Sequence, residues 1–477
     1  MKYETVMGLE VHVELATNSK LFCGCSAKFG ADANENVCPA CMGMPGMPAV
    51  TNKRAVELGI AASLVTNSEI SREITFDKKN YFYPDLPASY QITQWFAPIC
   101  RGGWVEIETE AGPRKITLKQ IHIEEDAGKL VHDNRTGTSL VDFNRTSVPL
   151  VEIVSNPDFR TAEEVVAYLE KLRSLLSFAG VSDCKMQEGS MRCDVNISVR
   201  EAGSNKLGTR VEIKNMNSLK AITTAIAYES GRHIDALETG SETLRQETRG
   251  WNDDLGETFP MREKEEAADY RYFPNPELLP ISVSQTWIDE IRGSLPESAQ
   301  EKYLRLTSEI GLSEYDSRLI TSGKNLSAIF DKTTHHYNEP KEVVNWIMVE
   351  LLAIAKGDNK GEDDIDIDCR KFAKLIEMAH RKEINRNTAK KILPLILSDG
   401  VDPAAYVREH RLSAIGDTGV IESAVGEVLA EHAKLADEYR AGNQKAFGFL
   451  VGQSMKKLAG KADPQLVNQI LQKRLEG

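Results

Sequence analysis

The chain has 477 residues, and 58 Lys and Arg against 71 Asp and Glu give it a formal net charge of −13. Such a balance excludes indiscriminate nucleic-acid binding over the whole surface, although it permits a local basic patch. No apolar run reaches roughly 18 residues, which excludes a membrane-spanning helix. The charged opening segment MKYETVMGLEVHVEL lacks the apolar core of a signal peptide, so we expect a cytoplasmic protein with reduced thiols.

The first predicted strand is LEVHVEL, residues 9–15, in which apolar and polar residues alternate. Successive side chains of a strand point to opposite faces of the sheet. Glu10, His12 and Glu14 therefore share one face, and the apolar residues share the other. An ordinary half-buried strand with a hydrated face would show the same pattern.

Four of the eight cysteines follow, arranged as Cys23-x-Cys25, twelve residues, and Cys38-x-x-Cys41. Two close pairs at this separation are typical of a four-sulfur zinc site. Free thiols are one alternative, and two disulfides would be another in an oxidising compartment. A zinc ion held by four thiolates would be structural, because no coordination position stays open.

Three later segments also place acidic residues on strands. They are IHIEEDAGK with Glu124 and Glu125, MRCDVNISVR with Asp194, and RVEIKN with Glu212. If these strands lie beside the first one in an antiparallel sheet, several carboxylates and His12 converge. Two negative charges about 4 Å apart repel by roughly 4 kcal/mol at an effective dielectric near 20, so this convergence favours a bound cation. Carboxylates with a histidine suit Mg²⁺ or Mn²⁺, which can present nucleotide phosphates for transfer.

Three common catalytic motifs are missing from the sequence. No G-x-x-x-x-G-K-[ST] occurs, so an ATP site in this chain is not a P-loop. Neither a G-x-S-x-G elbow nor a serine-based amidase cluster occurs, so the sequence shows no sign of a nucleophilic hydrolase.

The sequence pattern changes near residue 293, after which apolar residues recur at helical spacing. One earlier helix is expected from residue 161, where Thr161 and Glu164 form a capping box. Two helical stretches are basic: residues 369–391 hold eight Lys or Arg against two Glu, and residues 440–477 hold seven against two acidic residues. A nucleic-acid-binding surface and a solvated helix face both explain such patches.

Seven segments together resemble the B subunits of the tRNA-dependent amidotransferases, the GatB family. The resemblance extends from Met1 to the C-terminus, and several of the strings are long and rich in aromatic residues. The large domain that the related archaeal subunit carries before its helical part has no room here. The segments are KNYFYPDLP (79–87), HIEEDAGK (122–129), VPLVEIVSNPD (148–158), EGSMRCDVN (188–196), VEIKNMNS (211–218), DYRYFP (269–274) and GFLVGQSMK (448–456).

The resemblance implies an α+β fold in three parts. Residues 1–293 would form a glutamine synthetase-like, antiparallel-sheet cradle that carries the catalytic site and the zinc-binding loop. Residues 294–405 would form an all-α helical domain. Residues 406–477 would form a YqeY-like helical tail that binds tRNA.

The resemblance also implies a reaction, that of a carbon–nitrogen ligase with glutamine as amido donor. With ATP and Mg²⁺, the enzyme would phosphorylate the side-chain carboxylate of Glu on tRNA(Gln) or of Asp on tRNA(Asn), and ammonia would displace the phosphate. The ammonia would come from a glutaminase A subunit, which a small C subunit holds to the B subunit in a heterotrimer. Which of the two tRNAs is used depends on the synthetases of the organism.

Site residues follow by position from the resemblance. Lys79 lies where the family places its polar ammonia path, and Glu188 and Asp194 complete the nucleotide site. The predicted catalytic group is Glu10, His12, Glu124, Glu125 and Lys79, with Glu10, His12 and Glu125 as magnesium ligands. The predicted zinc ligands are Cys23, Cys25, Cys38 and Cys41, as in the zinc-bearing branch of the family.

The predicted cationic residues form two groups. Arg249, Arg262 and Arg271 are candidates for balancing phosphate charge, although surface ion pairing would also explain each of them. The predicted tRNA-binding residues of the tail are Arg440, Lys445, Lys456, Lys457 and Lys461.

Two other functions compete with this interpretation. A zinc-stapled, non-catalytic tRNA-binding protein would explain the cysteines and the basic stretches but not the carboxylate-bearing strands. A self-contained small-molecule ligase of the glutamine synthetase type would explain those strands but leave the basic tail without a role. ATP hydrolysis that depends on mischarged tRNA separates all three.

Overall fold

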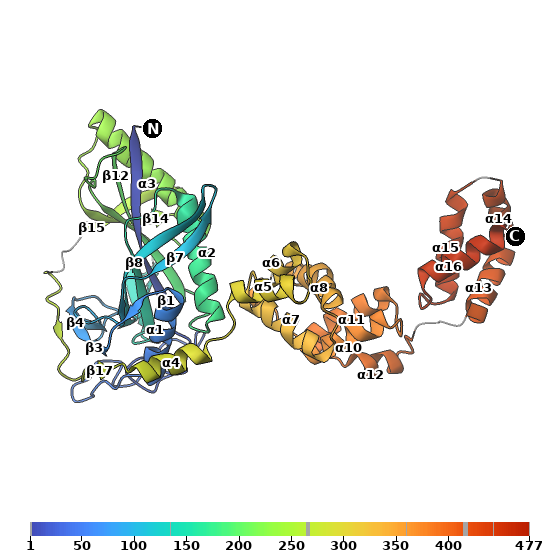
Figure 1. Cartoon of the computed structure of the whole chain (residues 1–477), viewed down its shortest axis with the longest axis horizontal. Helices are drawn as coiled ribbons and strands as arrows, with labels where there is room; N and C mark the ends of the chain where they lie inside the picture. Colours follow the sequence, from blue (N-terminus) through green and yellow to red (C-terminus); the bar gives the residue numbers. More distant parts are fainter. Residues whose placement is uncertain are drawn as a thin grey trace. The chain divides into compact units, whose positions relative to one another are not determined.

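The structure is a computed structural model that describes residues 2–133, 135–263, 268–358, 360–413, 418–441 and 443–476, with the backbone alone at residues 262 and 263. The chain divides into two compact units, Met1–Ser298 and Ala299–Gly477. The first unit contains the sheets, and the regular elements described in the second are helices (Figure 1).

The first unit is built on a ten-stranded sheet. Nine strands follow one another across the sheet, and the tenth, β7 (Trp104–Thr109), pairs with β8. The order is β15 (Glu257–Glu263), β14 (Glu247–Asn252), β13 (Val211–Lys214), β12 (Met191–Glu201), β1 (Tyr3–Glu14), β11 (Pro149–Ser155), β8 (Gly112–Glu125), β6 (Cys100–Arg101) and β2 (Glu69–Ile70).

The sheet is mixed, which corrects the expectation of an antiparallel one. β13 and β14 pair in parallel, whereas the other neighbouring pairs are antiparallel. The helix α3 (Leu219–Thr239) connects these two strands. A crossover helix returns the chain to the end at which the previous strand began, so the next strand runs parallel to it.

Three smaller sheets are found among the described residues of the first unit. They are β10 (Thr138–Asp142) with β9 (Lys129–Asp133); β16 (Phe273–Pro274) with β4 (Asp77–Asn80) and β5 (Tyr90–Thr93); and β17 (Ile281–Ser282) with β3 (Glu73–Ile74).

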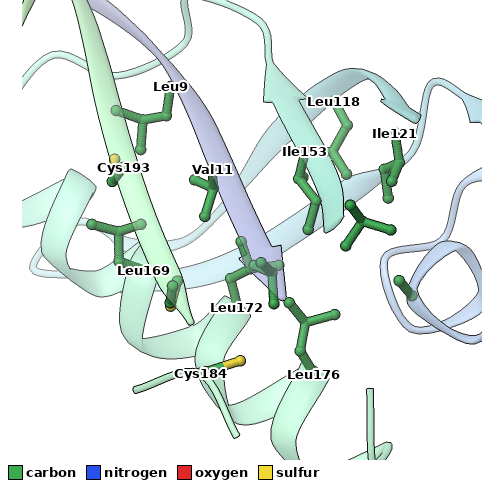
Figure 2. Close-up of a cluster of buried hydrophobic side chains, with 14 of the residues drawn as sticks. Leu9, Val11, Leu118, Ile121, Ile153, Leu169, Leu172, Leu176, Cys184 and Cys193 are labelled. Atoms are coloured by element: carbon green, nitrogen blue, oxygen red, sulfur yellow. The ribbon is translucent and has the colours of Figure 1, made fainter. Parts of the chain in front are cut away.

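The core of this unit lies between the large sheet and its helices, α1 (Lys53–Val65), α2 (Ala162–Phe178), α3 and α4 (Gln285–Ser294). Figure 2 shows Leu9 and Val11 of β1 near Leu169 and Leu172 of α2. Leu9 is 1% exposed and Val11 is not exposed at all, so the predicted alternation is confirmed. The helix-facing side of β1 is thereby assigned to the core, and its polar residues lie on the opposite face.

The predicted capping box at the start of α2 is also confirmed. The hydroxyl of Thr161 accepts a hydrogen bond from the backbone N–H of Glu164, and the carboxylate of Glu164 accepts one from the backbone of Thr161.

The regular elements described in the second unit are helices, which confirms the predicted helical character of this region, and the described residues form two hydrophobic clusters there. One cluster is formed by residues between 306 and 407, and the other by residues between 421 and 475. The helices are α5 (Ala299–Ser308), α6 (Glu314–Ile320), α7 (Lys324–His336), α8 (Pro340–Trp346), the π-helical turn η1 (Ile347–Leu351), α9 (Leu352–Gly357), the 3₁₀ turn η2 (Glu362–Asp364), α10 (Cys369–His380), α11 (Arg386–Asp399), α12 (Pro403–Glu409), α13 (Thr418–Glu431), α14 (Ala433–Arg440), α15 (Lys445–Lys457) and α16 (Pro464–Glu476).

Candidate active site and cysteine cluster

The sheet face opposite the helices carries charged side chains from neighbouring strands. On β1, His12 lies opposite Glu152 of β11, and Glu152 in turn lies opposite His122 of β8. On the other side of β1, Glu10 lies opposite Asp194 of β12. Because the register is fixed by burial of the apolar residues, the same register brings these polar groups together.

His12, Glu124 and Glu152 form the first cluster, which we call the histidine cluster. One potential ligand atom from each residue lies within 4.8 Å of those of the other two. His12 Nε2 lies 3.4 Å from Glu124 Oε1 and 3.5 Å from Glu152 Oε2. His122 lies beside this cluster, and its Nε2 is 2.9 Å from Glu152 Oε2. Two carboxylates with an imidazole are a ligand set for a divalent cation such as Mg²⁺ or Mn²⁺.

The histidine cluster is electrostatically balanced by its own residues. Burial alone would lower the pKa of His12 and of His122, but the carboxylates of Glu152 and Glu124 raise both to about 10. Burial alone would raise the pKa of Glu124, and the two histidines hold it well below its usual range instead. A cation bound by His12 must displace the proton from the coordinating nitrogen, so metal binding here is linked to proton release.

Glu10, Asp194 and Glu212 form the second cluster, which we call the carboxylate cluster. Their ligand oxygens also lie within 4.8 Å of one another. Lys214 contacts Asp194, and its Nζ lies 3.4 Å from Glu212 Oε1. Burial and the neighbouring carboxylates of Glu152 and Glu212 raise the pKa of Glu10. Three carboxylates with one lysine leave an excess of negative charge, which a hard cation would neutralise.

Both clusters face one cavity of about 340 Å³. His12 and Glu124 of the histidine cluster line it, as does Asp194 of the carboxylate cluster. Lys79 lines the same cavity, and its ammonium group lies 4.8 Å from the ring centroid of Tyr270. The structure thus brings Glu10, His12, Glu124, Asp194 and Lys79 of the predicted site to one region of the sheet.

Glu125 and Glu188 lie outside both clusters. Glu125 follows Glu124 on β8 and points to the other side of the strand, where its Oε1 accepts a hydrogen bond from the backbone N–H of Ile92 at 2.8 Å. Burial raises its pKa to about 7, and it lines a second cavity together with Cys41. Glu188 is half-exposed in the loop before β12 and forms an ion pair with Lys185, at 2.9 Å.

The three arginines predicted for phosphate charge have different surroundings. Arg249 is buried, and its guanidinium donates to Thr258 Oγ1 and to Glu247 Oε1, both at 2.8 Å. Arg271 is exposed and has a left-handed backbone conformation, with φ 46°. The backbone of Arg262 lies in β15, and its side chain is outside the described part of the chain.

Three residues in or beside the two clusters were not predicted as site residues, namely His122, Glu152 and Glu212, and neither were Arg192 and Lys214, which line the cavity. The first three each had a signal that could have been used. His122 precedes Glu124 by two residues and therefore shares its face, and Glu152 is the charged residue within the apolar strand PLVEIVS. Glu212 was expected among the converging carboxylates but was not assigned as a site residue.

The four predicted cysteines also converge. The Sγ atoms of Cys23, Cys25, Cys38 and Cys41 lie within 4.8 Å of one another. Cys41 Sγ accepts a hydrogen bond from the backbone N–H of Cys38 at 3.1 Å, as metal-bound thiolates do. All eight cysteines of the chain lie in the described part, and none of them forms a disulfide.

The surroundings of the four cysteines fit a metal ion. Lys20 is fully buried, and its ammonium lies 3.7 Å from Cys41 Sγ and 3.3 Å from the carbonyl oxygen of Phe143. Contacts with Cys23 and Cys38 and the charge of Lys20 lower the pKa of Cys41 to about 5, against the effect of burial. Four thiols in this electropositive setting could hold one metal ion, and the donor set is compatible with a structural zinc.

The predicted tRNA-binding cations of the tail differ in their ion pairing. Lys457 lies between Glu427, at 2.7 Å, and Glu431, at 2.6 Å, and Arg440 pairs with Asp437 at 3.1 Å. Within the described residues, no ion pair is found for the remaining three, which are Lys445, Lys456 and Lys461.

No described helix combines the length and the apolar character that a membrane span requires.

A family profile described as "GatB/GatE catalytic domain" matches residues 5–289, and one described as "GatB domain" matches residues 328–475. The B subunit of the aspartyl/glutamyl-tRNA(Asn/Gln) amidotransferase from Lachnoclostridium phytofermentans is 51% identical over 473 residues, which cover 99% of both chains. The protein of the same name from Thermoanaerobacter sp. strain X514 is 49% identical over 475 residues, which cover the whole of both chains. With both profiles and full-length relatives at this identity, the chain belongs to the family of aspartyl/glutamyl-tRNA(Asn/Gln) amidotransferase B subunits.

Proposed function

We propose that the chain uses ATP to activate the side-chain carboxylate of Glu on tRNA(Gln), of Asp on tRNA(Asn), or of both, for amidation. The observation that carries the proposal is the convergence of two candidate cation-binding clusters on one cavity of the sheet. ATP-dependent activation of a carboxylate brings several negative charges together, and such a site needs cations to stabilise them.

The proposed reaction has two steps. A carboxylate oxygen of the mischarged amino acid attacks the γ-phosphorus of ATP, ADP leaves, and an acyl phosphate forms. Ammonia then attacks the carbonyl carbon, and the C–O bond breaks as inorganic phosphate leaves with the electron pair and the surplus proton. The activation is required because a free carboxylate is a poor electrophile towards ammonia.

The residues around the cavity have distinct proposed roles in these steps. Divalent cations, when bound by the histidine cluster and the carboxylate cluster, would neutralise charge on the transferred phosphate. Lys214 and Arg192 line the cavity beside the clusters and provide fixed positive charge to phosphate oxygens. Lys79 faces the same cavity and contributes to the polar path by which ammonia arrives.

The partners belong to the same proposal. Because the chain offers no hydrolytic nucleophile motif, the ammonia would come from a glutaminase A subunit, with a C subunit completing a heterotrimer in the cytoplasm. Zinc would occupy the four-cysteine cluster as a structural ion. The glutamine synthetase-like cradle of residues 1–293, the helical domain of residues 294–405 and the tRNA-binding tail of residues 406–477 remain part of this proposal.

The test is a reconstitution of the chain with the A and C subunits of the same organism. The complex receives ATP, Mg²⁺, glutamine and either Glu-tRNA(Gln) or Asp-tRNA(Asn), with correctly charged Gln-tRNA(Gln) as the control. We expect phosphate release and amide formation with a mischarged tRNA and neither with the control. tRNA binding without phosphate release would identify a non-catalytic binder, and phosphate release that needs no tRNA would identify a self-contained ligase.

A further inference from the structure

Each of the two clusters contains a carboxylate that accepts a hydrogen bond from a buried threonine of another strand. Thr93 Oγ1 donates to Glu124 Oε2 at 3.1 Å in the histidine cluster. Thr248 Oγ1 donates to Glu212 Oε2 at 2.8 Å in the carboxylate cluster. The two threonines are 3% and 1% exposed, so water does not compete freely for either hydroxyl.

In the carboxylate cluster, Thr248 fixes one oxygen of Glu212 while the other is directed towards the cluster. Thr248 of β14 lies directly opposite Glu212 of β13 in the parallel pair. Glu212 Oε2 accepts from Thr248, and Oε1 lies 3.4 Å from Lys214 Nζ, on the side of the other cluster members. The carboxylate is therefore held at both ends and cannot rotate freely about its terminal bond.

Strand β14 is anchored on its other face directly after Thr248. Arg249 points towards the helix side, where Nε donates to Thr258 Oγ1 of β15 at 2.8 Å. A β-bulge at this step pairs Thr248 with Arg262 and Arg249 with Pro260. The extra residue is Met261 of β15, so β14 itself stays regular, and the buried guanidinium of Arg249 fixes it to Thr258. Arg249 thus supports the placement of Thr248.

In the histidine cluster, Thr93 has an equivalent position on a strand from a different sheet. β5 is attached to the end of β8 by two hydrogen bonds to Glu125: Ile92 N donates to its Oε1 at 2.8 Å, and Gln91 Nε2 donates to its backbone oxygen at 2.7 Å. These bonds hold Thr93 over Glu124 Oε2, while Glu124 Oε1 lies 3.4 Å from His12 Nε2.

We propose that Thr93 and Thr248 are positioning residues, each of which orients the metal-ligating carboxylate of a different cluster. The inference rests on the proposed function, because it takes both clusters as binding sites for divalent cations. An ionised carboxylate can only accept hydrogen bonds, so each threonine hydroxyl must donate. One oxygen of Glu124 and one of Glu212 are thereby occupied, and the second oxygen of each is directed to its cluster. Groups that orient metal ligands in this way typically change metal affinity about 10- to 100-fold when they are removed.

The test measures Mn²⁺ binding to the purified full-length chain by electron paramagnetic resonance, which distinguishes free from bound ion. The wild type should bind two ions. Thr93→Val and Thr248→Val preserve the shape of the side chain but remove the donor, and each should weaken one site about 10- to 100-fold while the second site keeps its affinity. The double variant should weaken both. Thr93→Ser and Thr248→Ser retain the donor and should restore binding to within about threefold of the wild type.

A matched control and a second measurement separate positioning from general stability. Thr5→Val removes a hydroxyl of β1 that donates to Ser230 at 3.2 Å, and it should leave Mn²⁺ binding unchanged. In the complex with the A and C subunits, both valine variants should raise the Mg²⁺ concentration for half-maximal activity and keep kcat at saturating Mg²⁺. Loss of kcat with an unchanged Mg²⁺ dependence would contradict positioning.

The outcomes distinguish this inference from the proposed function. If the wild type binds two ions and both valine variants bind them with wild-type affinity, the positioning role is refuted and the proposed function stands. If the serine variants weaken Mn²⁺ binding as much as the valine variants do, the hydroxyl group does not orient the carboxylate and the inference is refuted. If the wild type itself binds no Mn²⁺, the metal clusters of the proposed function are refuted together with this inference.

Discussion

The ammonium group of Lys20 lies 3.7 Å from the Sγ of Cys41, and the whole Lys20 side chain is buried. Within the described residues, Lys20 forms no ion pair with a carboxylate. A buried cation is costly unless a negative charge compensates for it. Four thiolates around one divalent cation carry two net negative charges, so a metal-loaded cysteine cluster would supply that compensation.

The first prediction concerns this lysine. Lys20→Met should release zinc about tenfold faster to a chromophoric chelator than the wild type, because the thiolates lose their compensating charge. The exposed Lys28 belongs to the same loop, and Lys28→Met is therefore the matched control, with a wild-type release rate expected. Equal release rates for all three proteins would show that Lys20 does not stabilise the metal.

The second prediction concerns the metal itself. Protein purified without chelator should contain one zinc ion per chain, and the double change Cys38→Ser and Cys41→Ser should abolish it. A structural zinc contributes on the order of 10 kcal/mol to folding, so the double variant should unfold at a much lower temperature. Elemental analysis gives the first result and a thermal melt gives the second. A wild-type preparation without zinc would refute the zinc assignment.

The third prediction concerns Glu152, which joins His12 and Glu124 in the histidine cluster. Glu152→Gln removes an anionic ligand, so tRNA-dependent phosphate release should fall by more than the roughly 10- to 100-fold that loss of an outer-shell partner costs. tRNA binding and glutamine hydrolysis by the A subunit should persist. Glu163→Gln changes an exposed residue at the start of α2 and serves as the control. Normal amide formation by the Glu152→Gln variant would show that Glu152 takes no part in the reaction.

Strand periodicity predicted much of this site, and register explains what it missed. The two-residue period correctly placed Glu10 and His12 on the face opposite Leu9 and Val11. Periodicity says which face a residue occupies but not which residues lie across from it on other strands. Glu152 belongs to the site because it lies opposite His12 on the neighbouring strand, and the sequence does not show which strands are neighbours.

The two-residue period also shows why two consecutive acidic residues of a strand cannot both lie on the face that carries the site. Glu124 and Glu125 are consecutive on β8, so one of them must turn away from the face that the other occupies. Glu125 instead holds β5 through Ile92 and Gln91. The parallel pairing of β13 and β14 was missed for a related reason: it depends on the path of α3 between them, which local patterns do not specify.

The fourth prediction is a pH dependence. Burial alone would raise the pKa of Glu229, but His233 and Arg232 lower it from the usual 4.5 to about 2. A carboxyl with a depressed pKa in the folded state stabilises the protein fully above pH 4.5, and this stabilisation is lost as the pH falls towards 2. Glu229→Gln removes a charge that Arg232 contacts, although Arg232 keeps Glu242 as a partner, and it should cost about 3 kcal/mol near neutral pH, because one pKa unit corresponds to about 1.4 kcal/mol. The difference in melting temperature between wild type and variant should therefore shrink below pH 4.5; a constant difference would contradict the ionised state of Glu229.

The fifth prediction concerns tRNA binding by the tail. α13 to α16 enclose a hydrophobic cluster of their own, whereas a chain that ends at residue 405 would also lose half of α12 and Val407 of the neighbouring cluster. The truncation is therefore placed after residue 413, where it removes the last cluster and leaves the other helices and the sheet intact. This truncation should weaken tRNA binding and flatten its salt dependence, while subunit assembly and glutamine hydrolysis persist. Unchanged affinity and salt slope would move the docking role to the basic stretch of residues 369–391 or to the first unit.

Single lysines refine the fifth prediction, because they differ in their ion pairing. Lys456 is exposed and has no ion pair within the described residues, whereas its neighbour Lys457 is neutralised by Glu427 and Glu431. A lysine that contacts one phosphate changes the slope of log K against log salt by roughly 0.7 to 0.9. Lys456→Ala should show this change in a salt titration of tRNA binding. Lys457→Ala should show much less, because its charge is already compensated in the free protein, and equal slopes for the two variants would contradict a docking role for the unpaired lysine.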